Sequence, residues 1–497
     1  MTVSHWIGGS QVPSTGATQP ILDPSTGQQI GSVALADAAV VDQAVQDALR
    51  AAKAWGRVSL AKRTDIMYAF RQLLVEHTDE LAQIISREHG KTVPDAAGEI
   101  ARGRESVEFA CGIASHLKGD YTSNASSGVD VHSVRQPLGV VAGITPFNFP
   151  AMVPMWMHPI AIATGNAFIL KPSERDPSAA NFVADLYKKA GLPDGVFQVV
   201  HGGKDAVDAL LAHPGVAAVS FVGSTPIARY VQAQGIAAGK RVQALGGANN
   251  HAVVMPDADM AFAASQITAG AFGSAGERCM AVPVAVAVGG SADALIAELT
   301  KEANAIVVGP GDQKATSMGP VITAASRQRV IDFVDEAVAG GAEAVVDGRA
   351  LVVPGHEEGF FVGPTILRHV QPTMRAYCDE VFGPLLVVME VDTLADAIAL
   401  VNSSPYGNGT AIFTASGEAA RIFTEEIQVG MVGVNVPIPV PVGYYSFGGW
   451  KDSLFGDHHA HGPEGVRFYT RAKAITTRWP HQEQRAASAS LNFPGHT

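Results

Sequence analysis

Cys279 is the residue of this chain whose surroundings best suit nucleophilic chemistry. It lies in the stretch Ala-Phe-Gly-Ser-Ala-Gly-Glu-Arg-Cys-Met-Ala, residues 271–281. Glycine and other small residues over 273–276 let the backbone and a ligand approach each other closely. The preceding residue, Arg278, favours thiolate over thiol, and the thiolate is the form of cysteine that attacks carbon. An inert buried cysteine is the competing interpretation, and this stretch alone does not decide between the two.

Composition narrows the classes of function that such a nucleophile could serve. The 497 residues carry a formal net charge of −12, which argues against nucleic acid as a partner. Three cysteines provide no disulfide framework and fit a reducing compartment. No signal peptide is visible, and the apolar stretch 152–170 contains Pro, His and Asn residues that lipid would leave unsatisfied. We therefore expect a soluble, cytoplasmic protein without a membrane partner.

Apolar patterns predict two α/β units. Predicted strands alternate with predicted helices from residue 140 to 238, and again from about residue 248 onward. Such alternation is typical of a parallel, doubly wound sheet of the kind that binds dinucleotides. The G-x-G-x-x-G fingerprint is absent, so a standard Rossmann phosphate loop is not predicted. Gly223 and Ser224, where a strand ends and a helix begins, offer a different contact for a phosphate.

A polar, strand-forming segment over 118–139 leaves the first unit, and a closing strand over 472–479 is its candidate partner. Exposed strands of this kind can pair with the sheet edge of another subunit. The predicted boundaries are a first unit over 1–117 and 140–247, a second unit over 248–465, an arm over 118–139 and 466–482, and a mobile tail over 483–497.

With Cys279 and the first unit in view, the chain resembles the aldehyde dehydrogenase superfamily over roughly residues 5–480. The motifs that carry the resemblance are Thr-Pro-Phe-Asn-Phe-Pro (145–150), Leu-Lys-Pro-Ser-Glu (170–174), Phe-Val-Gly-Ser-Thr (221–225) and Glu-Val-Phe-Gly-Pro (380–384). The resemblance implies two doubly wound α/β domains, the first binding NAD and the second catalytic, plus a β-arm for oligomerisation. It also implies a homodimer or homotetramer.

The resemblance gives each motif a role. Cys279 would attack an aldehyde carbon, pass hydride to nicotinamide and keep the product as a thioester. The Asn148 side-chain amide, with the Cys279 backbone N–H, would hold the oxyanion. Glu174 near the adenosine ribose would disfavour a 2′-phosphate, so NAD is expected rather than NADP. The positions implied for cofactor binding are Phe147, Lys171, Glu174, Gly223, Ser224, Glu380 and Phe382.

Without the resemblance, these polar residues have plainer interpretations. Asn148 would be a turn cap, Lys171 a surface lysine and Glu380 a solvated acid. The helix expected over 94–117 carries four charged residues whose spacing, taken alone, favours a solvated face with i,i+3 pairs: Glu99, Arg102, Arg104 and Glu105. No metal site is predicted.

One departure from the family bears on the reaction. Hydrolytic members carry a Glu-Leu-Gly-Gly-Lys motif whose Glu activates water, whereas residues 244–248 here are Ala-Leu-Gly-Gly-Ala. Ala244 stands at the Glu position, and a shift of one residue would put Gln243 or Leu245 there, neither of which is a usable base. General-base assistance is worth about 10²–10⁴-fold, so water should release the acyl group slowly. Coenzyme A, a thiol, is the expected acceptor.

This pattern resembles the CoA-acylating branch of the superfamily that acts on methylmalonate or malonate semialdehyde. The branch usually has Lys where Asn249 stands. The resemblance implies a carboxylated aldehyde, oxidised to propanoyl-CoA or acetyl-CoA with loss of the carboxylate. Arg102 and Arg278 would hold that carboxylate bidentately, and Arg104 replaces Arg102 if the helix phase differs by half a turn.

Two other functions stay open. The first is a hydrolytic NAD-dependent aldehyde dehydrogenase that gives a free carboxylic acid and recruits Glu380, Glu277 or Glu464 as its base. The second is a binding or structural role with catalysis lost, against which the complete set of Cys279, Asn148, Lys171 and Glu380 argues.

Overall fold

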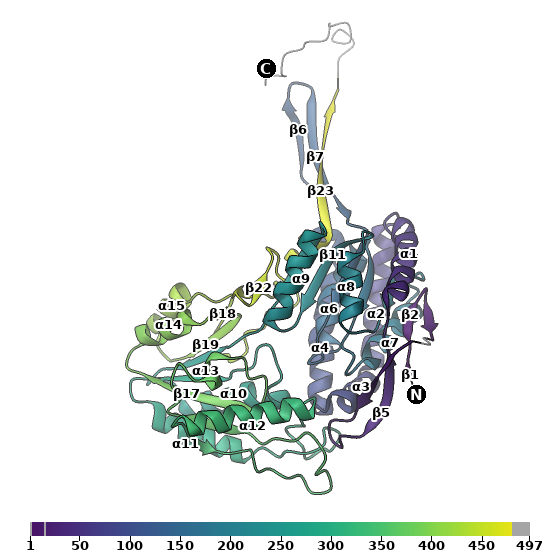
Figure 1. Ribbon diagram of the computed structural model, residues 1–497. Coiled ribbons are helices and arrows are strands. Elements are labelled where there is room, and N and C mark those ends of the chain that lie inside the picture. Colours follow the sequence, from purple (N-terminus) through teal and green to yellow (C-terminus); the bar gives the residue numbers. More distant parts are fainter. Residues whose placement is uncertain (1, 14–15, 480–497) are drawn as a thin grey trace.

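The computed structural model describes residues 2–13 and 16–479, so the tail expected over 483–497 lies outside the described residues. Two α/β bodies lie side by side, and a narrow three-stranded arm projects from the first of them (Figure 1). Among the described residues, no helix is both long enough and apolar enough to cross a lipid bilayer.

The first body is built on an eight-stranded sheet whose five central strands are parallel. In spatial order the strands are β22 (Leu454–Phe455), β12 (Arg241–Leu245), β11 (Val216–Val222), β8 (Val140–Ile144), β9 (Ala167–Lys171), β10 (Phe197–Val199), β2 (His5–Ile7) and β3 (Ser10–Val12). Every residue of β8 and β9 is buried. This is why these strands are continuous apolar runs rather than alternating ones.

Helices cover both faces of this sheet, as a doubly wound fold requires. One face packs against α1 (Ala38–Trp55), α8 (Lys204–Ala212) and α9 (Thr225–Ala237). The other face packs against α6 (Met152–Ala163) and α7 (Ser178–Lys189). A further layer packs on these two helices: α2 (Leu60–Glu76), α3 (Thr78–His89), α4 (Val93–Cys111) and α16 (Gly462–Tyr469). The helix expected over 94–117 is interrupted, because α4 ends before Gly112 and the short α5 (Ile113–His116) follows.

The second body is built on a seven-stranded sheet that is parallel except for β15 at one edge. In spatial order its strands are β15 (Glu343–Val346), β16 (Thr365–Arg368), β17 (Leu385–Val391), β14 (Val284–Val288), β13 (His251–Val254), β19 (Gly409–Phe413) and β20 (Met431–Val434). Its helices are α10 (Met260–Phe272), α11 (Ala292–Asn304), α12 (Ala324–Ala339), α13 (Arg375–Cys378), α14 (Leu394–Ser403) and α15 (Gly417–Glu426). The expected α/β class with two wound sheets is confirmed.

The arm is an antiparallel sheet of β6 (Tyr121–Ser126), β7 (Val129–Pro137) and β23 (Thr470–Arg478). The expected pairing of the closing strand with the 118–139 segment is confirmed, because β23 pairs with β7 from Thr470↔Pro137 to Arg478↔Val129. Two small sheets complete the fold: β1 (Thr2–Val3), β5 (Gln29–Ala34) and β4 (Thr18–Leu22), and β18 (Tyr406–Gly407) with β21 (Trp450–Lys451).

Asn166 fastens the arm to the first sheet. Its Oδ1 accepts from the backbone N–H groups of Leu138 and Gly139, at 2.8 and 3.0 Å, where β7 passes into β8. Its Nδ2 donates to the carbonyls of Ala161 and Tyr469, the latter at the end of α16 and directly before β23. The side chain is fully buried, so water cannot replace these bonds.

We predict that Asn166→Ala lowers the free energy of unfolding by about 2–5 kcal/mol, because it leaves several buried backbone groups without partners at about 1–3 kcal/mol each. Urea denaturation measures the effect. Asn402→Ala is the matched control, since that half-buried side chain also bridges two backbone groups, Glu426 O and Gln428 N, that water can reach. Equal losses for both variants would contradict the assignment.

Candidate active site

A strained turn presents Cys279. After α10 the chain makes a 3₁₀ turn over Gly273–Gly276 in which Ser274 and Ala275 adopt positive φ, 54° and 52°. Such backbone is unfavourable for residues with a Cβ and persists only where the surroundings enforce it. Gly276 also has positive φ, and a Cβ there would lie 2.2 Å from the Gly383 carbonyl oxygen. The turn is therefore pressed against the 380–384 loop.

Two asparagines fix the backbone of the cysteine. Asn250 and Asn408 each donate to the Cys279 carbonyl at 3.0 Å. Asn250 also donates to Ala281 O and accepts from Gly409 N. Sequence reasoning missed both residues. The available signal was a polar Asn-Asn pair entering a fully buried strand, since buried polar groups need partners.

A cavity of 420 Å³ adjoins the cysteine. Its apolar wall consists of Phe149, Met152, Trp156, Met280, Ile438 and Val440. Four charged side chains also line it: Asp95, Glu99, Arg102 and Arg278. The structure thus brings both arginines of the expected clamp into one cavity with Cys279. Arg104 does not line that cavity and faces Glu108 instead.

Both arginines already have partners. Arg278 Nη2 lies 2.5 Å from Asp95 Oδ1. Arg102 pairs with Glu105 at 2.6 Å and donates to the carbonyls of Val440 and Pro441 at 3.1 and 3.0 Å. The solvated-face interpretation of α4 is therefore wrong for the buried Glu99. The expected i,i+3 pair does form between Arg102 and Glu105, but these two side chains face the cavity and the 440–443 loop.

The pKa of Cys279 differs from the sequence-based expectation. Arg278 alone would lower it, yet burial, and after it the nearby Glu380 carboxylate, raise the pKa of the Cys279 thiol to about 12. The backbone N–H groups of Cys279 and Met280 and the Arg278 guanidinium act in the opposite direction and are outweighed. Because Arg278 is paired with Asp95, the negative charge of Asp95 offsets part of the effect of Arg278 on the thiolate.

Asn148 lies in the segment that joins β8 to α6. It is 3% exposed, and its side-chain amide makes no hydrogen bond to any part of the chain that the structure describes. The amide therefore has donors to offer to a ligand. Its neighbour Phe149 lines the cavity beside Cys279.

The cofactor positions of the first body gather at the carboxyl edge of its sheet, where open α/β sheets bind ligands. Lys171 ends β9, and its Nζ donates to Glu174 at 3.2 Å and to Gly202 O at 2.9 Å. Gly223 and Ser224 join β11 to α9. A Cβ on Gly223 would lie 2.5 Å from the Phe221 ring, and the Ser224 side chain at the N-terminus of α9 caps no backbone N–H.

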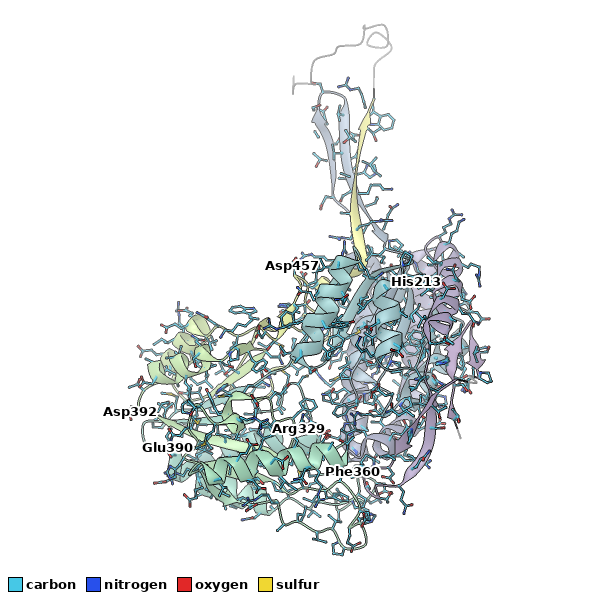
Figure 2. All side chains as sticks on the ribbon, viewed as in Figure 1. His213, Arg329, Phe360, Glu390, Asp392 and Asp457 are labelled. Atoms are coloured by element: carbon cyan, nitrogen blue, oxygen red, sulfur yellow. The ribbon has the colours of Figure 1, made fainter. Side chains whose placement is uncertain are left out.

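Glu380 and Phe382 approach from the second body. The Phe382 and Phe147 rings meet edge to face at 5.9 Å. Glu380 Oε1 accepts from Ala248 N at 3.0 Å, and burial raises the pKa of Glu380 to about 7. Arg329, which lies on α12 (Figure 2), donates to Phe382 O. A second, small cavity is shared by Cys279, Glu380, Phe382 and Ala248.

None of the residues at or next to the expected position of the hydrolytic base can act as a base. Ala244 is fully buried in β12, opposite Phe221 and Phe455. Leu245 is buried as well, and Gln243 donates to the carbonyls of His458 and His459.

The other candidate acids differ in whether they share a cavity with Cys279. Glu277 is fully buried, accepts from Ile322 N at 3.1 Å and has its pKa raised by burial to about 8. Glu464 pairs with His458 and Arg467. Neither lines a cavity with Cys279 in the described part of the chain, whereas Glu380 does.

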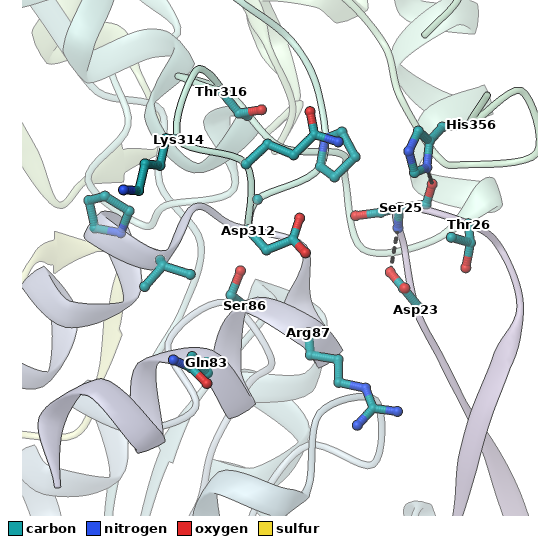
Figure 3. Close-up of a pocket in the computed structure, with 15 residues that line it drawn as sticks. Asp23, Ser25, Thr26, Gln83, Ser86, Arg87, Asp312, Lys314, Thr316 and His356 are labelled. Atoms are coloured by element: carbon teal, nitrogen blue, oxygen red, sulfur yellow. Dashed lines mark hydrogen bonds between the residues drawn. The ribbon is translucent and has the colours of Figure 1, made fainter. Parts of the chain in front are cut away.

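A larger cavity of 950 Å³ lies between the N-terminal segment, the end of α3 and the 310–316 loop (Figure 3). Arg87 and Lys314 line it together with Asp23 and Asp312, so the charges of its wall largely cancel. None of the candidate catalytic or cofactor residues lines it.

Comparisons with known proteins agree with this geometry. Residues 11–475 match the aldehyde dehydrogenase family. The malonate-semialdehyde dehydrogenase of Pseudomonas aeruginosa is 56% identical over 494 residues, covering 99% of each chain. Malonate-semialdehyde dehydrogenase 2 of Geobacillus kaustophilus is 47% identical over 479 residues, covering 96% of this chain and 99% of its own.

Solved structures agree as well. The methylmalonate-semialdehyde dehydrogenase of Oceanimonas doudoroffii superposes with a TM-score of 0.96 at 53% identity, covering 97% of this chain and 99% of its own. A candidate methylmalonate-semialdehyde dehydrogenase of Sinorhizobium meliloti 1021, complexed with NAD, has a TM-score of 0.96 at 49% identity, covering 97% and 98%. With a family match across most of its length and relatives of this identity, the chain belongs to the aldehyde dehydrogenase family.

Proposed function

We propose that this enzyme oxidises methylmalonate or malonate semialdehyde with NAD and transfers the acyl group to coenzyme A. The products would be propanoyl-CoA or acetyl-CoA, formed with loss of the carboxylate. The observation that carries the proposal is one cavity that contains Cys279, Arg102 and Arg278 together. The names of the relatives and the NAD complex of the Sinorhizobium protein support the same assignment.

The proposed NAD site fits the residues at the carboxyl edge of the first sheet. Gly223 leaves room for a close backbone approach, the Ser224 hydroxyl is free at a helix N-terminus, and such a terminus favours phosphate. Lys171 and Glu174 would contact the adenosine ribose, and Glu380 the ribose next to nicotinamide. NAD supplies a hydride acceptor when it is bound.

In the proposed mechanism Cys279 loses its thiol proton to solvent, and the sulfur attacks the aldehyde carbon as the thiolate. The carbonyl oxygen becomes an oxyanion, which the Asn148 amide and the Cys279 backbone N–H would hold. Departure of hydride from that carbon leaves a thioester on Cys279. Preorganised donors of this kind typically lower a barrier by about 3–4 kcal/mol each.

The two arginines would select the substrate. In these substrates one carbon atom separates the aldehyde carbon from the carboxylate, so the carboxylate needs a cation in the same cavity. Two guanidiniums can bind it through paired hydrogen bonds. Asp95 already occupies one side of Arg278, so the substrate would share that arginine rather than find it free.

The acyl acceptor follows from the missing base. Since Ala244 and its neighbours carry no carboxylate, water would attack the thioester without assistance, whereas the thiol of coenzyme A is intrinsically the better nucleophile. Hydrolysis is the second candidate reaction, and one observation favours it: Glu380 shares a cavity with Cys279.

The assembly of the enzyme is also a proposal. The arm exposes most of β6 and β23, and its strands stand clear of both bodies (Figure 1). Such strands need a covering partner, and a second copy of the chain is the proposed one, in a cytoplasmic homodimer or homotetramer.

Product identification tests the proposal. With NAD and malonate semialdehyde, we expect acetyl-CoA only when coenzyme A is present, and without it NADH formation should stop near one equivalent per subunit. Mass spectrometry of the products and stopped-flow absorbance make these measurements, and Cys279→Ala should abolish both. Free acid as the main product, at a rate indifferent to coenzyme A, would establish hydrolysis instead, and Glu380→Gln should then remove it.

Substrate selection gives a second prediction. Arg278→Ala or Arg102→Ala should raise KM for malonate semialdehyde about 10- to 100-fold, because each removes a charge-assisted hydrogen bond worth about 1.5–3 kcal/mol. KM for propanal should change less than about threefold, since propanal has no carboxylate. Arg104→Ala, on the same helix but outside the cavity, is the control. Equal effects on both aldehydes would refute the clamp.

The raised thiol pKa gives a third prediction. With a pKa of about 12, the thiolate fraction of Cys279 rises close to tenfold per pH unit near neutrality, and iodoacetamide reacts with the thiolate. Alkylation of the Cys279 peptide in the enzyme without NAD, followed by mass spectrometry, should therefore accelerate about tenfold per unit between about pH 7 and pH 9. Glu380→Gln should speed it at each pH by removing a nearby negative charge. A rate independent of pH would show that the thiol is already ionised.

A further inference from the structure

We propose that the buried Lys91–Glu99 ion pair is a positioning device for the oxyanion-binding amide of Asn148. The proposal rests on the function proposed above, because it takes Asn148 as the oxyanion donor. It adds two residues to which neither the sequence motifs nor the cavity chemistry gave a role.

The pair is isolated from solvent and in direct contact with the Asn148 backbone. The Lys91 and Glu99 side chains are 1% and 0% exposed. Lys91 Nζ donates to Glu99 Oε2 at 2.6 Å and to the Asn148 carbonyl oxygen at 2.6 Å. The same ammonium lies 4.4 Å from the centre of the Phe149 ring.

Glu99 holds the other end of the same segment. Its Oε1 accepts from the backbone N–H groups of Ala151 and Met152 at 2.9 and 3.1 Å. These groups begin α6, which has no capping side chain of its own, and the first N–H groups of a helix have no partner within it. Lys91 and Glu99 therefore grip residues 148–152 at both ends.

Lys91 is itself fixed against the second body. Its carbonyl accepts from Ser86 Oγ at 2.7 Å, and a Cβ on Gly311 would lie 2.3 Å from that carbonyl oxygen. Val93 N donates to Gly311 O at 3.0 Å. The lysine thus links Asn148, in the first body, to the backbone of the body that carries Cys279.

Stability alone does not explain the pair. Replacing a buried ion pair with apolar residues is often neutral or stabilising, so a chain selected only for folding would not need these charges. The Asn148 amide makes no side-chain hydrogen bond within the described residues, so only its backbone fixes its place. A displacement of about 1 Å at a catalytic group can cost about 10²-fold in rate.

A double-mutant cycle tests the proposal. Lys91→Met combined with Glu99→Met removes the pair without leaving a lone buried charge, and the measured quantity is the rate of the first NADH burst. We expect this rate to fall about 10- to 100-fold when Asn148 is present. In an Asn148→Ala background the same change should cost less than about threefold, because the amide to be positioned is gone. The Kd for NAD should stay within about threefold.

Two further variants separate positioning from general damage. Arg71→Met with Glu108→Met removes another ion pair of α4, which joins it to α2 at 2.9 Å and does not touch residues 148–152, and should leave the burst rate unchanged. Glu99→Gln keeps an acceptor for α6 but weakens the contact with Lys91, so its burst rate should be intermediate. Thermal unfolding of each variant shows whether it is folded. If the double replacement does not fold, Glu99→Gln in the two Asn148 backgrounds completes the cycle.

The outcomes distinguish this proposal from the one on which it rests. If Asn148→Ala leaves the burst rate unchanged, the oxyanion role fails and the positioning role fails with it. If Asn148→Ala slows the burst but loss of the ion pair has equal effects in both backgrounds, the pair is merely structural. The positioning proposal is then overturned while the proposed function stands.

Discussion

The candidate site depends on direct backbone contact between the two α/β bodies. The turn before Cys279 belongs to the second body, whereas Asn148 and the edge that holds Lys171 belong to the first. Contacts without side chains make this approach possible: Gly311 and Gly319 lie against the 90–91 backbone. A Cβ at either glycine would come within 2.3 Å of a carbonyl oxygen, far inside van der Waals contact. These two glycines therefore let the second body approach the backbone of Lys91, whose ammonium contacts the Asn148 carbonyl.

Positive side chains around the cavity lie beside negative ones. Each cation there has an assigned anion: Arg278 has Asp95, Arg102 has Glu105, and Lys91 has Glu99. Only the Lys91–Glu99 pair is fully buried, and it contacts backbone groups rather than the cavity's centre. The two arginine pairs are partly exposed, which lowers what each pair contributes to stability. Each arginine could share its guanidinium between its protein carboxylate and the carboxylate of the proposed substrate.

The sequence predicts those features of the structure that depend on residues close together in the chain. Continuous apolar runs at 140–144 and 284–288 predict buried parallel strands, and the order of short motifs predicts which loops meet. Local patterns do not predict β12 or β20 as strands, because β12 runs into the Gly-Gly stretch and β20 into a Gly- and Pro-rich one, where local signals indicate loops. Their strand character comes from partners distant in the chain, such as Val434↔Ile412.

The candidate site shows the same division. Cys279, Arg102 and Arg278 could be placed in one cavity from motifs, but Lys91, Glu99, Asn250 and Asn408 could not. Each of the latter serves a backbone group far away in sequence: Lys91 reaches across 57 residues and Asn408 across 129. On α4, Glu99 and Arg102 have the spacing of a solvated face, and only the packing of α6 against it decides otherwise. The expectation that Arg278 lowers the pKa of the Cys279 thiol was wrong for a related reason. Neither the burial of the thiol nor the pairing of Arg278 with Asp95 can be recognised from adjacent residues in the sequence.

Glu380 is the residue on which the two candidate reactions divide. With its pKa raised to about 7, it is near the value that suits a general base at neutral pH, and it lies close enough to raise the pKa of the Cys279 thiol. To activate water it must be an unoccupied carboxylate facing the thioester. Its proposed role at the nicotinamide ribose needs the same two oxygens, one of which already accepts from Ala248 N. Hydrogen bonds from the ribose and from Ala248 N would stabilise the ionised form of Glu380 and make it a weaker base toward water. If the cofactor remains bound during deacylation, the favoured acyl acceptor is therefore one that is nucleophilic without help from a base, such as a thiol.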